Sequence, residues 1–190
     1  MTLQVGALLL GAGFSRRFGS DKRLHQWQDK PIAAHTAALY TQVFDSVRVV
    51  IRAEDEALAS LLHGYDVELV FAKDAQLGMG HSLAAGMQNN PWDWTVVGLL
   101  DMPFVQPSTL QRLLSFVQKT QCPVVRFGQP TDRPPAHPVA WHRRLYPELA
   151  QAQGDQGGRD ILQRHLSEVA WLPCDDPGIY QDIDRPTDLP

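Results

Sequence analysis

The sequence predicts an α/β fold in which a single domain is built on a mainly parallel, doubly wound sheet. Short apolar runs of strand length alternate with amphipathic stretches of helix length, and the connections between them are short. No sequence repeat or change of composition divides residues 1–190. The 190 residues are enough to enclose a sizeable core, and 44% hydrophobic with 20% charged residues is ordinary for a folded globular chain.

In the first half of the chain, three largely apolar runs predict strands that are buried on both faces of a sheet. These strands are Val5–Leu10, Val47–Ile51 and Val67–Phe71. Two helices separate them. The first begins at Pro31, a residue type that is favoured in the first helical turn, and continues to about Gln42. The second covers Asp55–Leu62 and has Glu54 or Asp55 as its N-cap.

The second half of the chain continues the same alternation. Gly78–Ser82 opens one helix, and another begins at Pro107. The expected strands of this half are Trp94–Leu100, Pro123–Phe127, His137–Trp141 and Val169–Leu172. Gly128–Pro138 is rich in Gly, Pro, Arg and Asp, so we expect it to be a loop that lies over the site. Gly154–Gly158 precedes a last helix that continues through His165.

The charge and the cysteines exclude several classes of partner and place the chain in a reducing compartment. A net charge of −4 gives no general attraction to nucleic acid or to an anionic membrane, so any bound phosphate must be held by locally placed basic residues. Cys122 and Cys174 form neither a C-x-x-C pair nor a disulfide framework. The N-terminal stretch has no basic region, and its apolar run is too short to span a bilayer. We therefore expect a cytoplasmic protein with a small ligand.

The residues that follow the first predicted strand have the composition of a phosphate-binding loop. Gly11, Ala12 and Gly13 allow backbone N–H groups to approach phosphate oxygens closely, and Arg17 and Lys22 supply positive charge. The loop is not a dinucleotide fingerprint, which needs a third glycine at position 16. It is not a Walker A loop either, because its lysine follows an aspartate. A glycine-rich turn with solvated basic residues is the alternative.

Residues 10–22 resemble the signature loop of the MobA-like nucleotidyltransferases, L-A-A-G-x-S-x-R-M-G-x-x-K, with Gly11 in place of alanine and Phe18 in place of methionine. Four further blocks are similar to motifs of this family and stand in the same order: Gly78–Gly86, Leu100–Pro103, Ala136–Val139 and Asp182–Leu189. From the first block to the last, the resemblance extends over nearly the whole chain. The sequence departs from the family at Leu100 and Ala136, where the family has glycine, and at Ala72, where it often has asparagine.

The resemblance implies a Rossmann-like fold of the nucleotide-diphospho-sugar transferase kind, as one domain over residues 1–190. It also implies a reaction in which a phosphate monoester oxygen attacks the α-phosphorus of a nucleoside triphosphate and releases pyrophosphate. Gly154–Arg159, together with the D-M-P and H-P blocks, resembles the branch of molybdenum cofactor cytidylyltransferases. CTP and molybdopterin are then the expected substrates, and Mg²⁺ is the expected cofactor. The preference for CTP over GTP rests on Ala12 alone.

The family motifs imply a set of site residues in this sequence. The expected catalytic residues are Arg17, Lys22 and Asp101, because such a transfer needs charge neutralisation rather than a protein nucleophile. The expected nucleotide-binding residues are Leu10, Gly11, Ala12, Gly13, Ser15, Arg17, Lys22 and Ser82. The expected metal ligands are Asp101 and Asp184, and Asp182 competes with Asp184 for the second position.

The remaining assignments leave alternatives open. His137 is expected to position the acceptor, Arg16 is expected at the surface, and Ser82 is either a nucleotide ligand or a helix cap. A guanylyltransferase and a sugar- or polyol-phosphate nucleotidyltransferase are close alternatives for the activity. A non-catalytic accessory protein that binds nucleotide or cofactor for molybdoenzymes is an alternative of another class. A molybdoenzyme or its chaperone is the implied transient protein partner.

Overall fold

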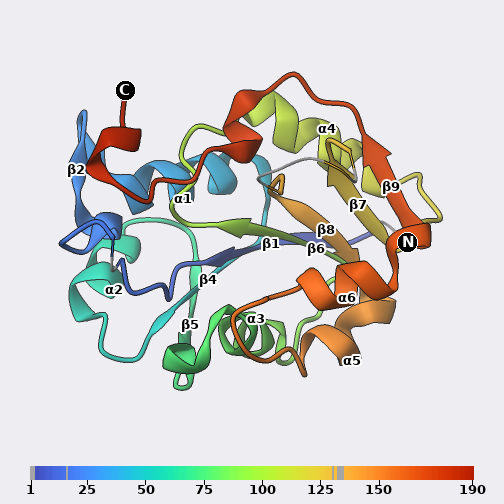
Figure 1. Ribbon diagram of the computed structural model, residues 1–190, viewed down its shortest axis with the longest axis horizontal. Helices are drawn as coiled ribbons and strands as arrows, with labels where there is room; N and C mark the ends of the chain where they lie inside the picture. Colours follow the sequence, from blue (N-terminus) through green and yellow to red (C-terminus); the bar gives the residue numbers. More distant parts are fainter. Residues whose placement is uncertain (1–2, 16, 130, 132–134) are drawn as a thin grey trace.

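A seven-stranded sheet forms the middle layer of the protein, in the order β5-β4-β1-β6-β8-β7-β9 (Figure 1). The computed structural model describes residues 3–15, 17–129, 131 and 135–190. The strands are Val5–Leu10 (β1), Val47–Arg52 (β4), Glu68–Ala72 (β5), Trp94–Leu99 (β6), Val124–Phe127 (β7), Val139–His142 (β8) and Val169–Leu172 (β9). All are parallel except β8, which runs antiparallel to both of its neighbours. The predicted mainly parallel sheet is confirmed.

Helices cover both faces of this sheet, so the predicted doubly wound α/β fold is also confirmed. On one face lie Ile32–Val43 (α1), Glu56–Leu62 (α2) and Pro107–Val117 (α4). On the other face lie Met79–Met87 (α3), Tyr146–Leu149 (α5) and Arg159–Arg164 (α6). Figure 1 shows α1 and α4 above the sheet and α3, α5 and α6 below it.

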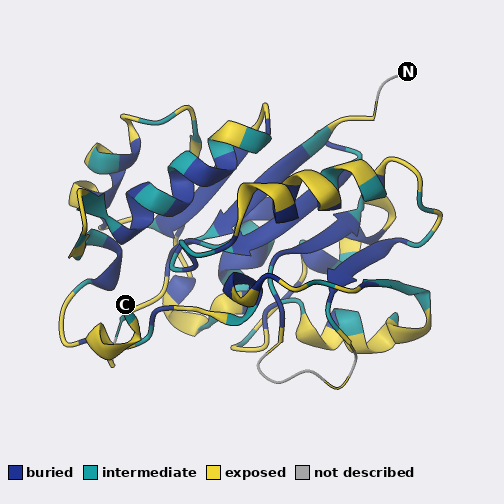
Figure 2. Cartoon of the chain, turned by 90° about the horizontal axis from the view of Figure 1, so that it is seen from above, coloured by how far each residue is buried: buried dark blue, intermediate teal, exposed yellow. Residues whose placement is uncertain are grey.

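The strands are buried because each supplies apolar side chains to two cores, one on each face of the sheet. In β1, Ala7 and Leu9 belong to the core beneath α1 and α4, while Leu8 belongs to the core beneath α3. All three side chains are fully buried. Figure 2 shows the same arrangement, with buried strands between helices whose outer surfaces are exposed. This burial on both faces explains why the strands appear in the sequence as apolar runs.

The order of the strands reverses at β1, which has β4 on one side and β6 on the other. Leu10, the last residue of β1, is paired with Leu99, the last residue of β6. In an open α/β sheet, ligands bind in the crevice that lies beyond the carboxyl ends of the strands at such a reversal. The loop that follows β1 and Asp101, which follows β6, therefore meet where a ligand is expected.

Two features of the architecture are not predicted by the sequence. Strand β8 lies between β6 and β7 in the sheet. The strands β6 and β7, which precede and follow α4 in the sequence, are therefore not neighbours. A small hairpin of Gln26–Trp27 (β2) and Lys30–Pro31 (β3) precedes α1. Both depend on pairing between segments, and a local apolar pattern contains no information about such pairing.

Part of the predicted loop Gly128–Pro138 lies outside the described residues. No helix in the described part of the chain is long and apolar enough to cross a membrane.

Candidate functional site

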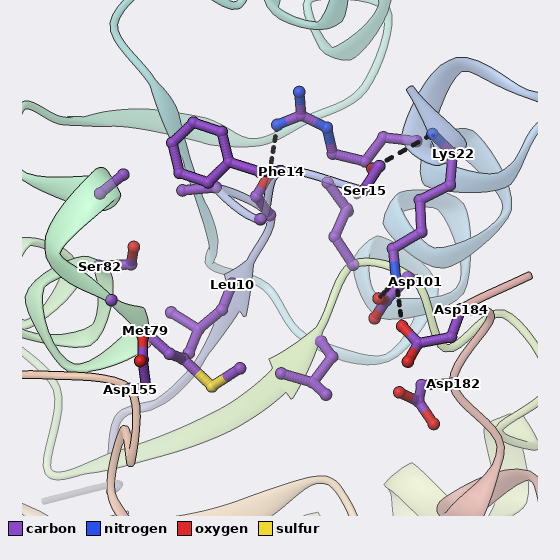
Figure 3. A pocket seen from close by; sticks show the side chains of 18 of the residues that line it. Leu10, Phe14, Ser15, Lys22, Met79, Ser82, Asp101, Asp155, Asp182 and Asp184 are labelled. Carbon is purple, nitrogen blue, oxygen red and sulfur yellow. Dashed lines mark hydrogen bonds and ion pairs between the residues drawn. The ribbon is translucent and has the colours of Figure 1, made fainter. Parts of the chain in front are cut away.

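A cavity of about 460 Å³ opens at the carboxyl ends of β1 and β6, and Figure 3 shows the side chains around it. Its walls contain every residue that the sequence analysis assigns to nucleotide or metal, namely Leu10, Gly11, Ala12, Gly13, Ser15, Arg17, Lys22, Ser82, Asp101 and Asp184. Gln76, Met79 and Asp155, which have no predicted role, also line it. His137 lines a different cavity, and Arg16 lies outside the described residues.

Hydrogen bonds to β4 and within the loop hold the loop that follows β1 in shape. The Gly11 N–H donates to the Val50 carbonyl at 2.8 Å, which keeps the start of the loop in register with β4. Ser15 has a φ of 49°, and its hydroxyl accepts a hydrogen bond from the Lys22 N–H at 3.3 Å. The Ser15 side chain thus joins two parts of the loop. A Cβ at Gly13 would meet no atom within 4 Å, so the cavity is open beside this residue.

Lys22 is the centre of the charged part of the cavity. Its Nζ lies 2.5 Å from Asp101 Oδ2 and 3.0 Å from Asp184 Oδ1, and only 10% of its side chain is exposed. Arg17 Nη1 contacts the other oxygen of Asp184 at 2.8 Å, although 72% of the Arg17 side chain is exposed. Burial favours the neutral amine, but the two carboxylates outweigh it and raise the pKa of Lys22. The Lys22 ammonium group is therefore charged and shared by two carboxylates.

The neighbouring Asp182 has a different environment from Asp184. Burial, together with the negative charges of Asp101 and Asp184, raises the pKa of Asp182. Burial acts in the same direction on Asp184, but its contacts with Lys22 and Arg17 outweigh burial and lower the pKa of Asp184. Of these two aspartates, Asp184 is the one that shares the Lys22 ammonium group with Asp101.

The C-terminal segment reaches the cavity because Ile183 anchors it. The Ile183 N–H donates to the Asp101 carbonyl at 3.0 Å, and the Ile183 side chain is fully buried. It packs in a small apolar cluster with Phe18 of the loop and Ile32 of α1. Asp182 and Asp184 flank this anchor and lie at the cavity beside Asp101 (Figure 3). Phe18, which replaces the family's methionine, thus serves in an apolar contact between the loop and the C-terminal segment.

The N-terminal turn of α3 forms the opposite wall of the cavity. Ser82 is buried there, and its interpretation as a helix cap is wrong because Gly78 occupies the N-cap position. The Gly80 N–H donates to the Gly154 carbonyl at 2.7 Å. A Cβ at Gly80 would lie only 2.5 Å from the Gln153 carbonyl. Residues 153–154 therefore cover part of this helix terminus, and the Gly80 N–H is already satisfied.

A second cavity, of about 390 Å³, adjoins the first. Leu10, Met79 and Asp155 line both cavities, so the two share one wall. The other residues around the second cavity include two cations, two large aromatic rings and the predicted acceptor ligand: Arg126, Arg159, Trp141, Trp171 and His137. The Arg126 guanidinium lies 5.5 Å from the centre of the Trp171 ring.

His137, which lines this second cavity, has an unpaired ring nitrogen. Its Nδ1 is buried and has no hydrogen-bond partner among the residues that the structure describes. Burial, reinforced by the positive charge of Arg126, lowers the pKa of His137 to about 4. The imidazole is therefore neutral near pH 7. A neutral imidazole cannot neutralise a phosphate.

Gly11 and Leu100, which both depart from the family motifs, contact each other at the ends of β1 and β6. A Cβ at position 11 would lie 2.5 Å from Leu100 Cδ2 and 3.2 Å from the Val50 carbonyl oxygen. Leu100 is 1% exposed and belongs to the core beneath α1 and α4. A larger residue at position 100 is therefore accommodated by a smaller residue at position 11, and the two departures compensate each other.

We expect Gly11→Ala to lower the free energy of unfolding by about 1–3 kcal/mol, because the added methyl group overpacks against Leu100. In a Leu100→Ala background, which removes the Cδ atoms, the same substitution should cost less, with a coupling energy of about 0.5–3 kcal/mol. Urea unfolding of the four proteins in this double-mutant cycle measures the coupling. Equal costs of Gly11→Ala in the two backgrounds would mean that the residues do not compensate.

The acidic side of the first cavity fits a hard divalent cation. Asp101 and Asp184 each place a carboxylate oxygen against the same ammonium group, so both can reach one cation. Carboxylate oxygens are the protein ligands that Mg²⁺ and Mn²⁺ prefer. Within the described ranges, no group of three or more His, Cys, Asp or Glu side chains is arranged to hold a metal. The remaining ligands would then be phosphate oxygens and water, which is usual for Mg²⁺.

Comparison with known proteins identifies relatives of the chain. A family model described as the MobA-like NTP transferase domain matches residues 7–169. Among curated proteins, the bifunctional protein GlmU of Pseudomonas aeruginosa (strain LESB58) is 30% identical over 122 residues, which are 64% of this chain and 27% of GlmU. The chain thus spans roughly a quarter of the length of that relative.

Solved structures share the fold over nearly the whole chain. Rv0371c from Mycobacterium tuberculosis H37Rv is 26% identical, with a TM-score of 0.80 and coverage of 99% of this chain and 96% of that one. The same mycobacterial protein in complex with manganese has a TM-score of 0.75. Molybdopterin-guanine dinucleotide biosynthesis protein A from Archaeoglobus fulgidus is 21% identical, with a TM-score of 0.71 and coverage of 97% and 94%. At this identity, the archaeal protein is evidence for the fold alone.

Proposed function

The chain belongs to the MobA-like NTP transferase family, and from this premise we propose that it transfers a CMP group from CTP to the phosphate monoester of molybdopterin and releases pyrophosphate. The observation that carries the proposal is the shared wall of the two cavities, formed by Leu10, Met79 and Asp155. One cavity contains the signature loop with its basic residues, and the other contains aromatic and cationic side chains. Transfer between two substrates requires that they be bound side by side in this way.

In this proposal, the triphosphate of the donor lies along the loop that follows β1. Lys22 and Arg17 neutralise the β- and γ-phosphates and the charge that develops on the departing pyrophosphate. Arg17 is suited to this role because it is largely exposed at the cavity, where its guanidinium is accessible to two phosphate oxygens at once. Ser82, on the wall formed by α3, contacts the nucleotide from the opposite side.

Asp101 and Asp184 would hold a Mg²⁺ ion in this site. When bound, the ion supplies neutralisation of phosphate charge. The convergence of both carboxylates on one ammonium group supports this assignment, and so does the manganese in the structure of the mycobacterial relative. The protein's own contribution is to fix the two carboxylates, Asp101 at the end of β6 and Asp184 beside the buried anchor Ile183.

The chemistry of the second cavity supports an acceptor that is both planar and anionic. Trp141 and Trp171 offer aromatic surfaces, and Arg126 and Arg159 offer positive charge. The neutral His137 lies in the wall of the same cavity. A phosphorylated pterin has this combination of a flat heterocycle, N–H groups and negative charge. Guanylyl transfer to the same acceptor is the second candidate, because only Ala12 favours CTP over GTP.

Pyrophosphate release separates these candidates when it is measured with each of the four NTPs, using molybdopterin, sugar phosphates and polyol phosphates as acceptors. We expect release that requires CTP, molybdopterin and a divalent cation together, and that stops when the cation is chelated. Release with GTP in place of CTP would establish the second candidate. A preference for UTP or dTTP would reject molybdopterin as the acceptor, and nucleotide binding without any release would identify an accessory protein.

A further inference from the structure

Arg23, which follows Lys22 in the sequence, is buried beside the loop that follows β1. Only 3% of its side chain is exposed. Its Nη1 donates to the Gly11 carbonyl at 2.5 Å and to Asp55 at 2.6 Å. Its Nη2 donates to Asp21 at 2.6 Å and to Asp55 at 2.8 Å, and its Nε donates to Asp21 at 2.8 Å. All the N–H groups of the guanidinium therefore have acceptors within the protein.

The turn between β4 and α2 supplies the other half of this network. Asp55 occupies the N-cap position of α2, but its carboxylate makes no cap hydrogen bond and binds Arg23 and Arg52 instead. The Arg52 guanidinium lies 2.6 Å from Asp55 and 4.8 Å from the centre of the Phe14 ring, which belongs to the loop. Arg23 and Arg52 thus form a network with Asp21 and Asp55, in which two positive charges face two negative charges. This network fastens the loop to the turn beside it.

Arg23 contacts Gly11 at one end of the loop and adjoins Lys22 at the other end. Its Nη1 donates to the Gly11 carbonyl oxygen and holds it. This oxygen is then kept from facing the oxygens of a phosphate, which carry negative charge and would repel it. Arg23 also belongs to the same short 3₁₀ turn as Lys22, Lys22–Leu24, so its side-chain contacts hold the turn in which Lys22 lies. We infer that Arg23 is a positioning residue of the nucleotide site, which sets nucleotide affinity by fixing Gly11 and Lys22. Arg23 borders the cavity, but its own N–H groups are occupied.

The identity of the ligand in this inference rests on the proposed function. The test compares Arg23→Lys with Arg48→Lys. Arg48 is a matched control because it is also a buried arginine that pairs with a carboxylate, Glu68, and donates to a backbone carbonyl, that of Gln88. It lies on β4 and lines neither cavity. Lysine keeps the positive charge at each position but cannot reach the same acceptors together.

We expect Arg23→Lys to weaken the binding of CTP with Mg²⁺, measured by calorimetry, by about 10- to 100-fold. The variant should raise KM for CTP more than it lowers kcat, and amide hydrogen exchange should become faster in residues 10–22. Arg48→Lys should lower the unfolding temperature without either change. Arg23→Met is a second variant, which should have the larger effect because it also removes a positive charge and leaves Arg52 as the one arginine that faces both Asp21 and Asp55 among the described residues.

Three results would overturn the inference: unchanged exchange in the loop of Arg23→Lys, faster exchange with unchanged CTP affinity, or equal losses of affinity in the Arg23 and Arg48 variants. A wild-type protein that binds none of the four NTPs would instead contradict the proposed function. In that case the exchange measurement still decides whether Arg23 fixes the loop, so the two failures are distinguishable.

Discussion

Asp101→Asn is expected to lower kcat for nucleotidyl transfer by about a hundred- to a thousandfold, while the protein remains folded. The substitution keeps the size of the side chain but removes one of the two negative charges that face Lys22. The side chain lies at the cavity wall, and the Asp101 carbonyl can still accept the hydrogen bond that anchors Ile183. Steady-state pyrophosphate release and thermal unfolding, measured on the same preparation, test both parts of this expectation.

The two aspartates that flank Ile183 provide the comparison. Asp184→Asn should approach the effect of Asp101→Asn, because Asp184 shares the Lys22 ammonium group with it. Asp182→Asn should have a much smaller effect, since burial and neighbouring negative charges raise the pKa of Asp182 and a neutral side chain suits its position. A larger loss of activity in Asp182→Asn than in Asp184→Asn would identify Asp182, rather than Asp184, as the partner of Asp101. Retention of most activity by Asp101→Asn would remove it from the catalytic set.

The sequence predicts the fold well because its signals are local. The predicted strands Val5–Leu10 and Val47–Ile51 are largely apolar because they are buried on both faces, and such runs are visible without knowledge of their neighbours. The position of β8 between β6 and β7 is not visible in this way, because Val139 pairs with residues 97 and 126, which belong to other strands. Which strands pair is decided by long-range packing and connection geometry, and no window of the sequence contains that information.

The motifs likewise predict which residues meet at the site but not the contacts between them. Every residue that the motifs assign to nucleotide or metal lines the same cavity. The sequence gives no indication that Lys22 lies between two carboxylates or that Gly11 makes room for Leu100. Arg23 is missed entirely, because its partner Asp55 lies in another turn and is predicted as a helix cap. These contacts arise only when the ends of several strands are brought together.

Lys22→Met is expected to have two effects of opposite sign. The activity should fall by about a hundred- to a thousandfold, because the triphosphate loses a buried positive charge. The affinity of the nucleotide-free protein for Mn²⁺ should rise, because Asp101 and Asp184 lose the ammonium group that competes with a metal for their oxygens. Binding of Mn²⁺, followed by electron paramagnetic resonance without nucleotide, measures the second effect. Arg17→Met is the control, since Arg17 contacts only the outer oxygen of Asp184 and is largely exposed, so it should raise the affinity much less.

The pair of effects tests whether one ammonium group serves two sets of anions. Lys22 lies within 3.0 Å of both carboxylates, so if it turns to the phosphates of a bound nucleotide, nucleotide binding and release of the carboxylates should be linked. We therefore expect a metal to bind weakly in the absence of nucleotide, and the metal and the nucleotide to bind more tightly together than separately. In Lys22→Met this coupling should disappear, so that CTP no longer strengthens the binding of Mn²⁺ by more than its own phosphate ligands account for. If Lys22→Met lowers the affinity for Mn²⁺ instead, the carboxylates need the lysine to hold their positions, and the competition does not exist.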